Sequence, residues 1–137
     1  MSSIYITHCT NKKDHRLRDT KQRVTPDKLY IGDKITRFIN RCRSQNVEWA
    51  IFSDLYGIWF PSEKHVYYEK HPNKVSKEEF ENLLNDTENK LKKYNIVYFY
   101  GNHKSHYFHH LYKKLITQLR KRGVNIIKLC TIYDIES

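Results

Sequence analysis

The fold of this chain is decided by two short stretches, Ile4–Lys13 with the sequence IYITHCTNKK and Trp49–Pro61 with the sequence WAIFSDLYGIWFP. Each begins as a run of apolar and aromatic residues, which is typical of a strand buried on both faces of a sheet. Each run then passes directly into a loop of small, polar and reactive side chains. Because ligands of open α/β sheets bind just beyond the carboxyl ends of the strands, these two loops predict a binding site.

The remaining pattern places helices between strands. Ser76 followed by Glu79 is a capping-box signature that begins one helix, and Gly123 marks the end of another. Alternating strands and helices predict a single α/β domain over residues 1–137, a three-layer sandwich with a mainly parallel four-stranded sheet. We expect strands at residues 4–9, 48–53, 95–100 and 125–129, helices at 29–44, 77–94 and 105–122, and an irregular segment at 54–73.

The charge of the chain is large and unevenly placed. Its 137 residues include 25 Lys and Arg against 15 Asp and Glu, a net charge of +10. Residues 89–133 contain no Asp or Glu and ten Lys or Arg. Such a segment is typical of a surface that binds a polyanion, although a solvated basic face without a partner is the alternative. We expect the nucleic-acid contacts to come from the basic residues of the last helix: Lys113, Lys114, Arg120, Lys121 and Arg122.

Other features of the composition narrow the class of protein. No apolar run reaches the length of a membrane span, and no charged segment followed by an apolar stretch opens the sequence. We therefore expect a cytoplasmic protein that does not enter a membrane. The three cysteines are widely spaced and form no CxxC pair, so we expect neither disulfides nor structural zinc. Nothing in the sequence calls for a metal or an organic cofactor.

Two residues at the strand ends are candidates for catalysis. Cys9 is followed closely by Lys12 and Lys13, whose positive charges would stabilise a reactive thiolate. The alternative is that Cys9 is a small packed residue under a loop whose lysines bind an anion. Asp54 is the carboxylate of the second loop and the leading general-base candidate, unless it and Ser53 only make local turn hydrogen bonds.

Four histidines, at positions 103, 106, 109 and 110, crowd the expected start of the last helix. His106 and His110 are four residues apart and form a possible metal pair, but an anion-binding helix start with Lys104 and Ser105 is the favoured interpretation. Aromatic and basic residues also alternate in residues 65–72. They suit base stacking and phosphate contacts, and they equally suit core packing.

The motifs together resemble a known group of small proteins. The Cys9–Lys13 element, the Leu29-Tyr30 pair, the Ser53–Pro61 segment and the Tyr68-Glu69 pair resemble the DUF6884-like group. That group is similar to the YaaA peroxide-stress family and, more remotely, to the archaeosine synthase lysine-transfer domain. The resemblance implies a uracil-DNA-glycosylase-like fold with a pocket for a nucleobase in DNA or tRNA. By that resemblance Cys9, Lys13, Ser53, Tyr56, Gly57 and Tyr68 would line the pocket.

The sequence therefore predicts a protein that binds nucleic acid, either tRNA or DNA, or a nucleotide-like ligand, and that acts on a base or glycosidic bond. A non-catalytic nucleic-acid-binding module and a small-molecule nucleotide-binding protein are the alternatives. The expected catalytic residues are Asp54, Cys9 and Glu69. The expected ligand-binding residues are Lys12, Lys13, Ser53, Tyr56, Gly57, Tyr68, Lys104 and Ser105.

Overall fold

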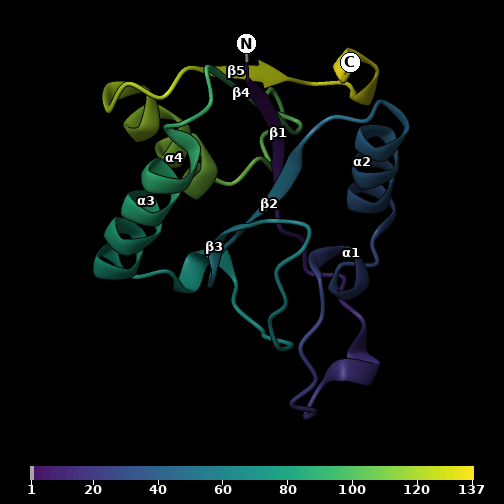
Figure 1. Ribbon diagram of the computed structural model, residues 1–137. Helices are drawn as coiled ribbons and strands as arrows, with labels where there is room; N and C mark the ends of the chain where they lie inside the picture. The colour runs from purple at the N-terminus through teal and green to yellow at the C-terminus, as the bar shows by residue number, and fades with distance from the viewer. Residues whose placement is uncertain (1) are drawn as a thin grey trace.

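The computed structural model describes residues 2–137, which form one five-stranded mixed sheet with helices on both faces (Figure 1). The strands lie side by side in the order β3-β2-β1-β4-β5. They are β1 (Ser3–His8), β2 (Trp49–Ser53), β3 (Gly57–Trp59), β4 (Ile96–Tyr100) and β5 (Ile126–Leu129). The helices are α1 (Pro26–Leu29), α2 (Asp33–Ser44), α3 (Lys77–Leu91) and α4 (His110–Lys121), with short 3-10 turns at His15–Leu17, Pro72–Lys74 and Ile132–Asp134.

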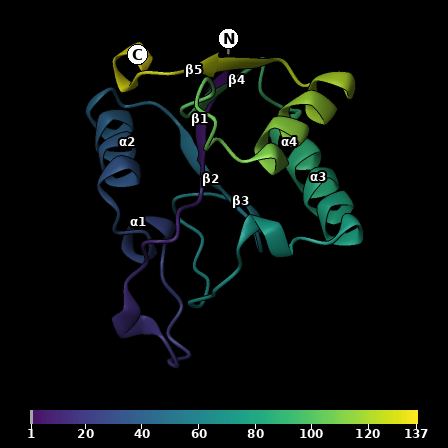
Figure 2. The same ribbon diagram turned by 180° about the vertical axis from the view of Figure 1, so that it is seen from behind.

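Two apolar clusters hold the three layers together. Ile4 and Ile6 of β1 pack on one face with the apolar sides of α3 and α4. Tyr5, between them in sequence, packs on the other face with residues of α1 and α2. Figures 1 and 2 show the two helix pairs on opposite sides of the sheet. This alternation is the period of two that a strand buried on both faces requires, and it confirms the predicted α/β layering.

The sheet differs from the prediction in one strand. All four expected strands are present and pair in parallel, but β3 pairs antiparallel to β2, so the sheet has five strands and is mixed. Ser53 pairs with Gly57 across a three-residue loop, and Gly57 has a φ of +73°. A hairpin of this loop length favours glycine in the left-handed conformation at that position. The expected irregular segment at 54–73 therefore begins with a hairpin that three strand residues were too few to reveal.

Two helices also differ in their bounds. The helix expected at 29–44 starts only at Asp33, and a separate short helix, α1, precedes it. The reason is that the chain at Tyr30 and Ile31 pairs with the loop after β1: Lys13 and Tyr30 form a bridge, and the Ile31 amide donates to the Lys12 carbonyl at 3.1 Å. The helix expected at 105–122 starts only at His110. His106 therefore lies in the preceding turn, and the interpretation of His106 and His110 as a pair on one helix face is wrong.

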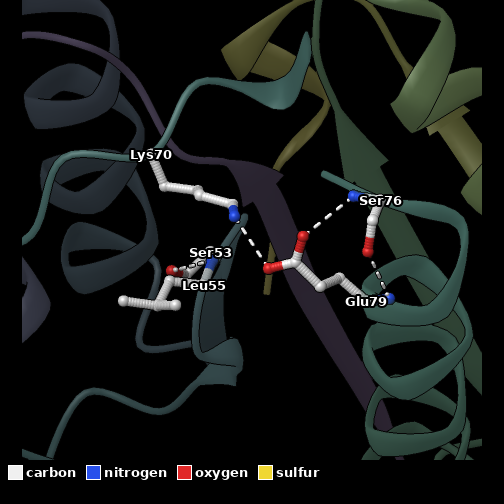
Figure 3. A network of polar contacts seen from close by, with 5 residues as sticks. All are labelled: Ser53, Leu55, Lys70, Ser76 and Glu79. Carbon is white, nitrogen blue, oxygen red and sulfur yellow. Dashed lines mark hydrogen bonds and ion pairs between the residues drawn. The ribbon is translucent and has the colours of Figure 1, made fainter. Parts of the chain in front are cut away.

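The helix starting at Lys77 is confirmed together with its capping box. The Ser76 hydroxyl accepts from the Glu79 amide at 3.1 Å, and the Glu79 carboxylate accepts from the Ser76 amide at 2.9 Å (Figure 3). Glu79 also pairs with Lys70 at 2.7 Å, which ties the start of α3 to the segment leading from the hairpin. Within residues 2–137 no helix is both long and apolar enough to cross a membrane.

Candidate functional site

A cavity of about 230 Å³ lies at the carboxyl ends of β1 and β2. We call it the histidine cavity, because three histidines line it. β1 is paired with β2 on one side and with β4 on the other, and the chain leaves β1 and β4 toward opposite faces of the sheet. Such a switch point is where open α/β sheets bind ligands. The lining residues are His8, Cys9, Thr10, Asn11, Asp54, Lys70, His71, Pro72, Tyr107, His109 and Tyr112.

A buried carboxyl group and a tyrosine form one wall of this cavity. Asp54 is only 3% exposed, and the Tyr112 hydroxyl donates to its two carboxylate oxygens at 3.0 and 3.2 Å. Burial raises the pKa of Asp54, because the charged form loses its hydration, although the Tyr112 hydrogen bonds and the charge of Lys13 act in the opposite direction. A buried carboxyl group with a raised pKa holds its proton to a higher pH than an exposed one, which suits a group that exchanges protons.

The thiol of Cys9 lies against the same tyrosine. Its Sγ is 3.7 Å from the Tyr112 hydroxyl oxygen. Burial, reinforced by the negative charge of Asp54, raises the pKa of Cys9 to about 12. The thiol is therefore protonated at neutral pH, and the neighbouring lysines do not make it a reactive thiolate. This favours the alternative in which Cys9 is a small packed residue of the cavity wall.

The histidines of the cavity present both an acceptor and a donor. His8 Nδ1 donates to the Cys9 carbonyl at 2.8 Å, and burial lowers the pKa of His8 to about 4. The ring is therefore neutral at pH 7, with Nε2 as a hydrogen-bond acceptor. In His71 and His109, by contrast, Nδ1 accepts a backbone amide hydrogen, from Asn73 at 3.1 Å and from Leu111 at 3.0 Å. Their neutral forms carry the proton on Nε2 and are donors there. His109 Nε2 donates to the Asn73 side-chain oxygen at 2.6 Å, so His71 is the histidine that offers a donor to the cavity.

Several predicted ligand-binding residues lie behind the cavity wall instead. Ser53 is fully buried. Its hydroxyl donates to the Tyr68 oxygen at 3.0 Å and accepts from the Tyr56 amide at 3.0 Å. It also accepts from the Leu55 amide at 3.1 Å (Figure 3). This is the local turn bonding that was the alternative for Ser53. The ring of Tyr56 stacks on His65 with centroids 4.0 Å apart, and so it supports the hairpin. A Cβ at Gly57 would lie 2.2 Å from the Asp86 carboxylate, so close approach explains this glycine.

A second pocket of about 320 Å³ adjoins the first and shares Asn11, Lys70 and His71 with it. We call it the lysine pocket, because Lys13 borders it. Its remaining lining residues are His15, Tyr67 and Glu69. Glu69 accepts hydrogen bonds from Arg18 and from the Tyr67 hydroxyl, and it does not line the histidine cavity. Glu69 and Asp54, both predicted to be catalytic, thus belong to two pockets. Lys12, Lys104 and Ser105 line neither pocket.

The basic residues predicted to contact nucleic acid are divided by their local partners. The Arg120 guanidinium donates to the Ile126 carbonyl at 2.8 Å, and Arg122 pairs with Glu88 at 3.0 Å and with Glu81 at 3.5 Å. The predicted lysines, at positions 113, 114 and 121, are exposed. Lys113 lies in the first turn of α4, near the cavity, whereas Lys121 is about 12 Å further along the helix axis.

Comparisons of the chain with protein-family models, with curated proteins and with solved structures gave no match. The resemblance to the DUF6884-like group and the uracil-DNA-glycosylase-like fold therefore stay predictions. The sequence reasoning did not assign Tyr107, His109 and Tyr112 to the site. The histidines at positions 103–110 were the sequence signal for this part of the cavity wall, because the loop before α4 supplies Tyr107 and His109.

Proposed function

We propose that the protein binds a nucleobase or a nucleotide-like ligand in the histidine cavity, and that nucleic acid presents this ligand. The cavity carries the proposal. Its volume of about 230 Å³ suits one heterocycle rather than an extended ligand. The His8 acceptor and the His71 donor match the mixed donor and acceptor edge of a base. The net charge of +10 favours a polyanionic partner.

Tyr107 offers a surface on which a base could stack. It lines the cavity and is 95% exposed, so its ring is free to meet a ligand. Stacking of a base on an aromatic ring contributes about 1–3 kcal/mol. Tyr133, which is 68% exposed and lines none of the described pockets at this edge, provides a matched control.

The test measures the binding of labelled tRNA, single-stranded DNA and duplex DNA by fluorescence anisotropy, at low and at moderate salt. Tyr107→Ala should weaken binding about 5- to 160-fold, the equivalent of one stacked base, whereas Tyr133→Ala should not change it. Replacing Lys113 and Lys114 by Gln should weaken binding and flatten its salt dependence. The same change at Lys92 and Lys121, at the far ends of α3 and α4, should have a smaller effect. Equal effects of both lysine pairs, or no binding at low salt, would overturn the proposal.

A non-catalytic binding module is the second candidate, and the state of Cys9 favours it. A thiol with a pKa of about 12 is a poor nucleophile, and the Asp54 carboxylate is engaged by Tyr112. The catalytic version of the proposal assigns proton transfer to Asp54 instead. Once a bound base is identified, Asp54→Asn should abolish turnover while binding persists. Unchanged turnover in Asp54→Asn and in Cys9→Ser would leave binding as the function.

A further inference from the structure

Lys13 is a buried basic residue without a direct ion pair within the described residues, although its charge acts on the buried Asp54 carboxyl group. The residue is 4% exposed, and within residues 2–137 its ammonium makes neither an ion pair nor a hydrogen bond. Its Nζ lies 4.7 Å from the centre of the Tyr68 ring and 5.8 Å from that of Tyr30. Aromatic faces stabilise an ammonium, but they do not replace the hydrogen bonds that water gives it. A buried amine held in this way lacks an acceptor.

The backbone keeps Lys13 in this position. Its neighbours are hydrogen-bonded to the chain around Tyr30: the Asp14 amide donates to the Leu29 carbonyl at 2.9 Å, and the Ile31 amide donates to the Lys12 carbonyl at 3.1 Å. The Tyr30 and Tyr68 hydroxyls are bonded to each other, and Ser53 donates to Tyr68. The ammonium therefore lies over two rings whose hydroxyls are held by hydrogen bonds. Its position is preorganised in the absence of a ligand.

The lysine pocket, which Lys13 lines, favours an anion. Of its two lysines, Lys70 forms an ion pair with Glu79 at 2.7 Å, whereas Lys13 forms no ion pair within the described residues. The one carboxylate of the pocket, Glu69, is engaged by Arg18 and Tyr67. Asn11 and His15 add polar groups beside the cation.

We infer that the lysine pocket is a phosphate-binding site in which the phosphate supplies the acceptor that the Lys13 ammonium lacks. The inference rests on the proposed function and deepens it. Because the two pockets share Asn11, Lys70 and His71, a base in the histidine cavity and a phosphate at Lys13 would belong to one nucleotide. The ligand class is then a phosphorylated nucleotide, free or within a strand, rather than a nucleoside.

Inorganic phosphate is the first probe, because it carries the charge without a base. Wild type, Lys13→Met and Lys12→Met are titrated with phosphate by calorimetry at constant ionic strength. Lys12 is the matched control, since it is the exposed neighbour of the same charge. Wild type and Lys12→Met should bind saturably, and Lys13→Met about 10- to 100-fold more weakly, as expected for one charged hydrogen bond. Equal affinity of all three proteins, or no binding by wild type, would overturn the inference.

A measurement on the wild type covers the case in which Lys13→Met does not fold. In an amide NMR titration, phosphate should shift the signals of Asn11, Lys13 and His15, and leave those of Lys113 and Lys121 in place. Shifts confined to α4 would contradict the site.

A comparison of a nucleoside with its 5′-monophosphate separates this inference from the proposed function. Equal affinity for the two would refute the phosphate site and leave base binding intact. Phosphate binding at Lys13 with no affinity for nucleosides, nucleotides or nucleic acid would support the site and refute the proposed function.

Discussion

Replacing Tyr112 by Phe should destabilise the protein in a pH-dependent way. The change removes one hydroxyl, which donates to both oxygens of the buried Asp54 carboxylate at 3.0 and 3.2 Å. Hydrogen bonds to charged groups contribute about 1.5–3 kcal/mol, and those between neutral groups about 1 kcal/mol. We therefore expect a loss of about 1.5–3 kcal/mol at a pH where Asp54 is ionised, and about 1 kcal/mol at a pH where it is protonated.

The sign follows from the pKa of Asp54. Burial raises this pKa above its ordinary value, so the folded state favours the protonated carboxyl group. The stability that this group contributes is therefore present at low pH and is lost as the pH rises and Asp54 ionises. The Tyr112 hydroxyl opposes this effect. Without that hydroxyl the pKa of Asp54 rises further, and the destabilisation by ionisation becomes larger.

Urea unfolding over a series of pH values from 4 to 8 measures the free energy of unfolding of both proteins. Thermal unfolding gives a second measure, since a chain of 137 residues should lose about 3.5 °C of Tm per kcal/mol. Tyr98→Phe is the control, since the Tyr98 hydroxyl makes no hydrogen bond within the described residues and should change stability by less than about 0.5 kcal/mol. In an Asp54→Asn background the cost of Tyr112→Phe should fall to about 1 kcal/mol at all pH values. If the loss of stability in Tyr112→Phe does not depend on pH while Asp54 is unchanged, the proposed hydrogen bonding of Tyr112 to an ionisable Asp54 is refuted.

Three further predictions follow from other parts of the structure. His8 has a pKa of about 4 in the folded protein against an ordinary value of 6.5, so the unfolded chain takes up the proton first as the pH falls. Urea unfolding should show that about 3 kcal/mol of stability is lost from this group between pH 6.5 and pH 4, and His8→Phe should remove that contribution. An unchanged dependence of stability on pH in His8→Phe would contradict a neutral His8. Gly57→Ala should lower the free energy of unfolding by about 2 kcal/mol or more, because φ is +73° and the new Cβ meets the Asp86 carboxylate. Gly32→Ala should lower it much less, because the nearest atom to its new Cβ is 3.5 Å away. Similar Tm values for the two variants would count against strain at the hairpin. Lys13→Met should raise the free energy of unfolding by about 1 kcal/mol or more without ligand, because it removes a buried charge that makes no ion pair or hydrogen bond within the described residues. A destabilised variant in urea titrations would show that the tyrosine faces and the charge of Asp54 compensate the buried ammonium fully.

The sequence by itself determined the order of the main elements and the edge of the sheet at which the site lies. Residues 4–9 and 48–53 read as buried strands because a run of apolar residues is a local signal. Ser76 and Glu79 revealed the start of α3 because a capping box is formed by residues three apart in the chain. The same locality explains why Gly123 marked the end of α4, where its φ is +92°.

Only the tertiary structure decided which side chains meet at that edge and in which protonation states. Tyr112 reaches Asp54 across 58 positions of the chain, and no local pattern encodes such a contact. The sequence placed lysines beside Cys9, which suggested a lowered pKa. Burial, reinforced by the charge of Asp54, instead raises the pKa of Cys9 to about 12, because these effects outweigh the hydrogen bonds to the thiol. Burial likewise keeps His8 neutral. The folded chain also places Lys13 Nζ over two tyrosine rings. Hydration and distant contacts set these states, and both come into being only when the chain has folded.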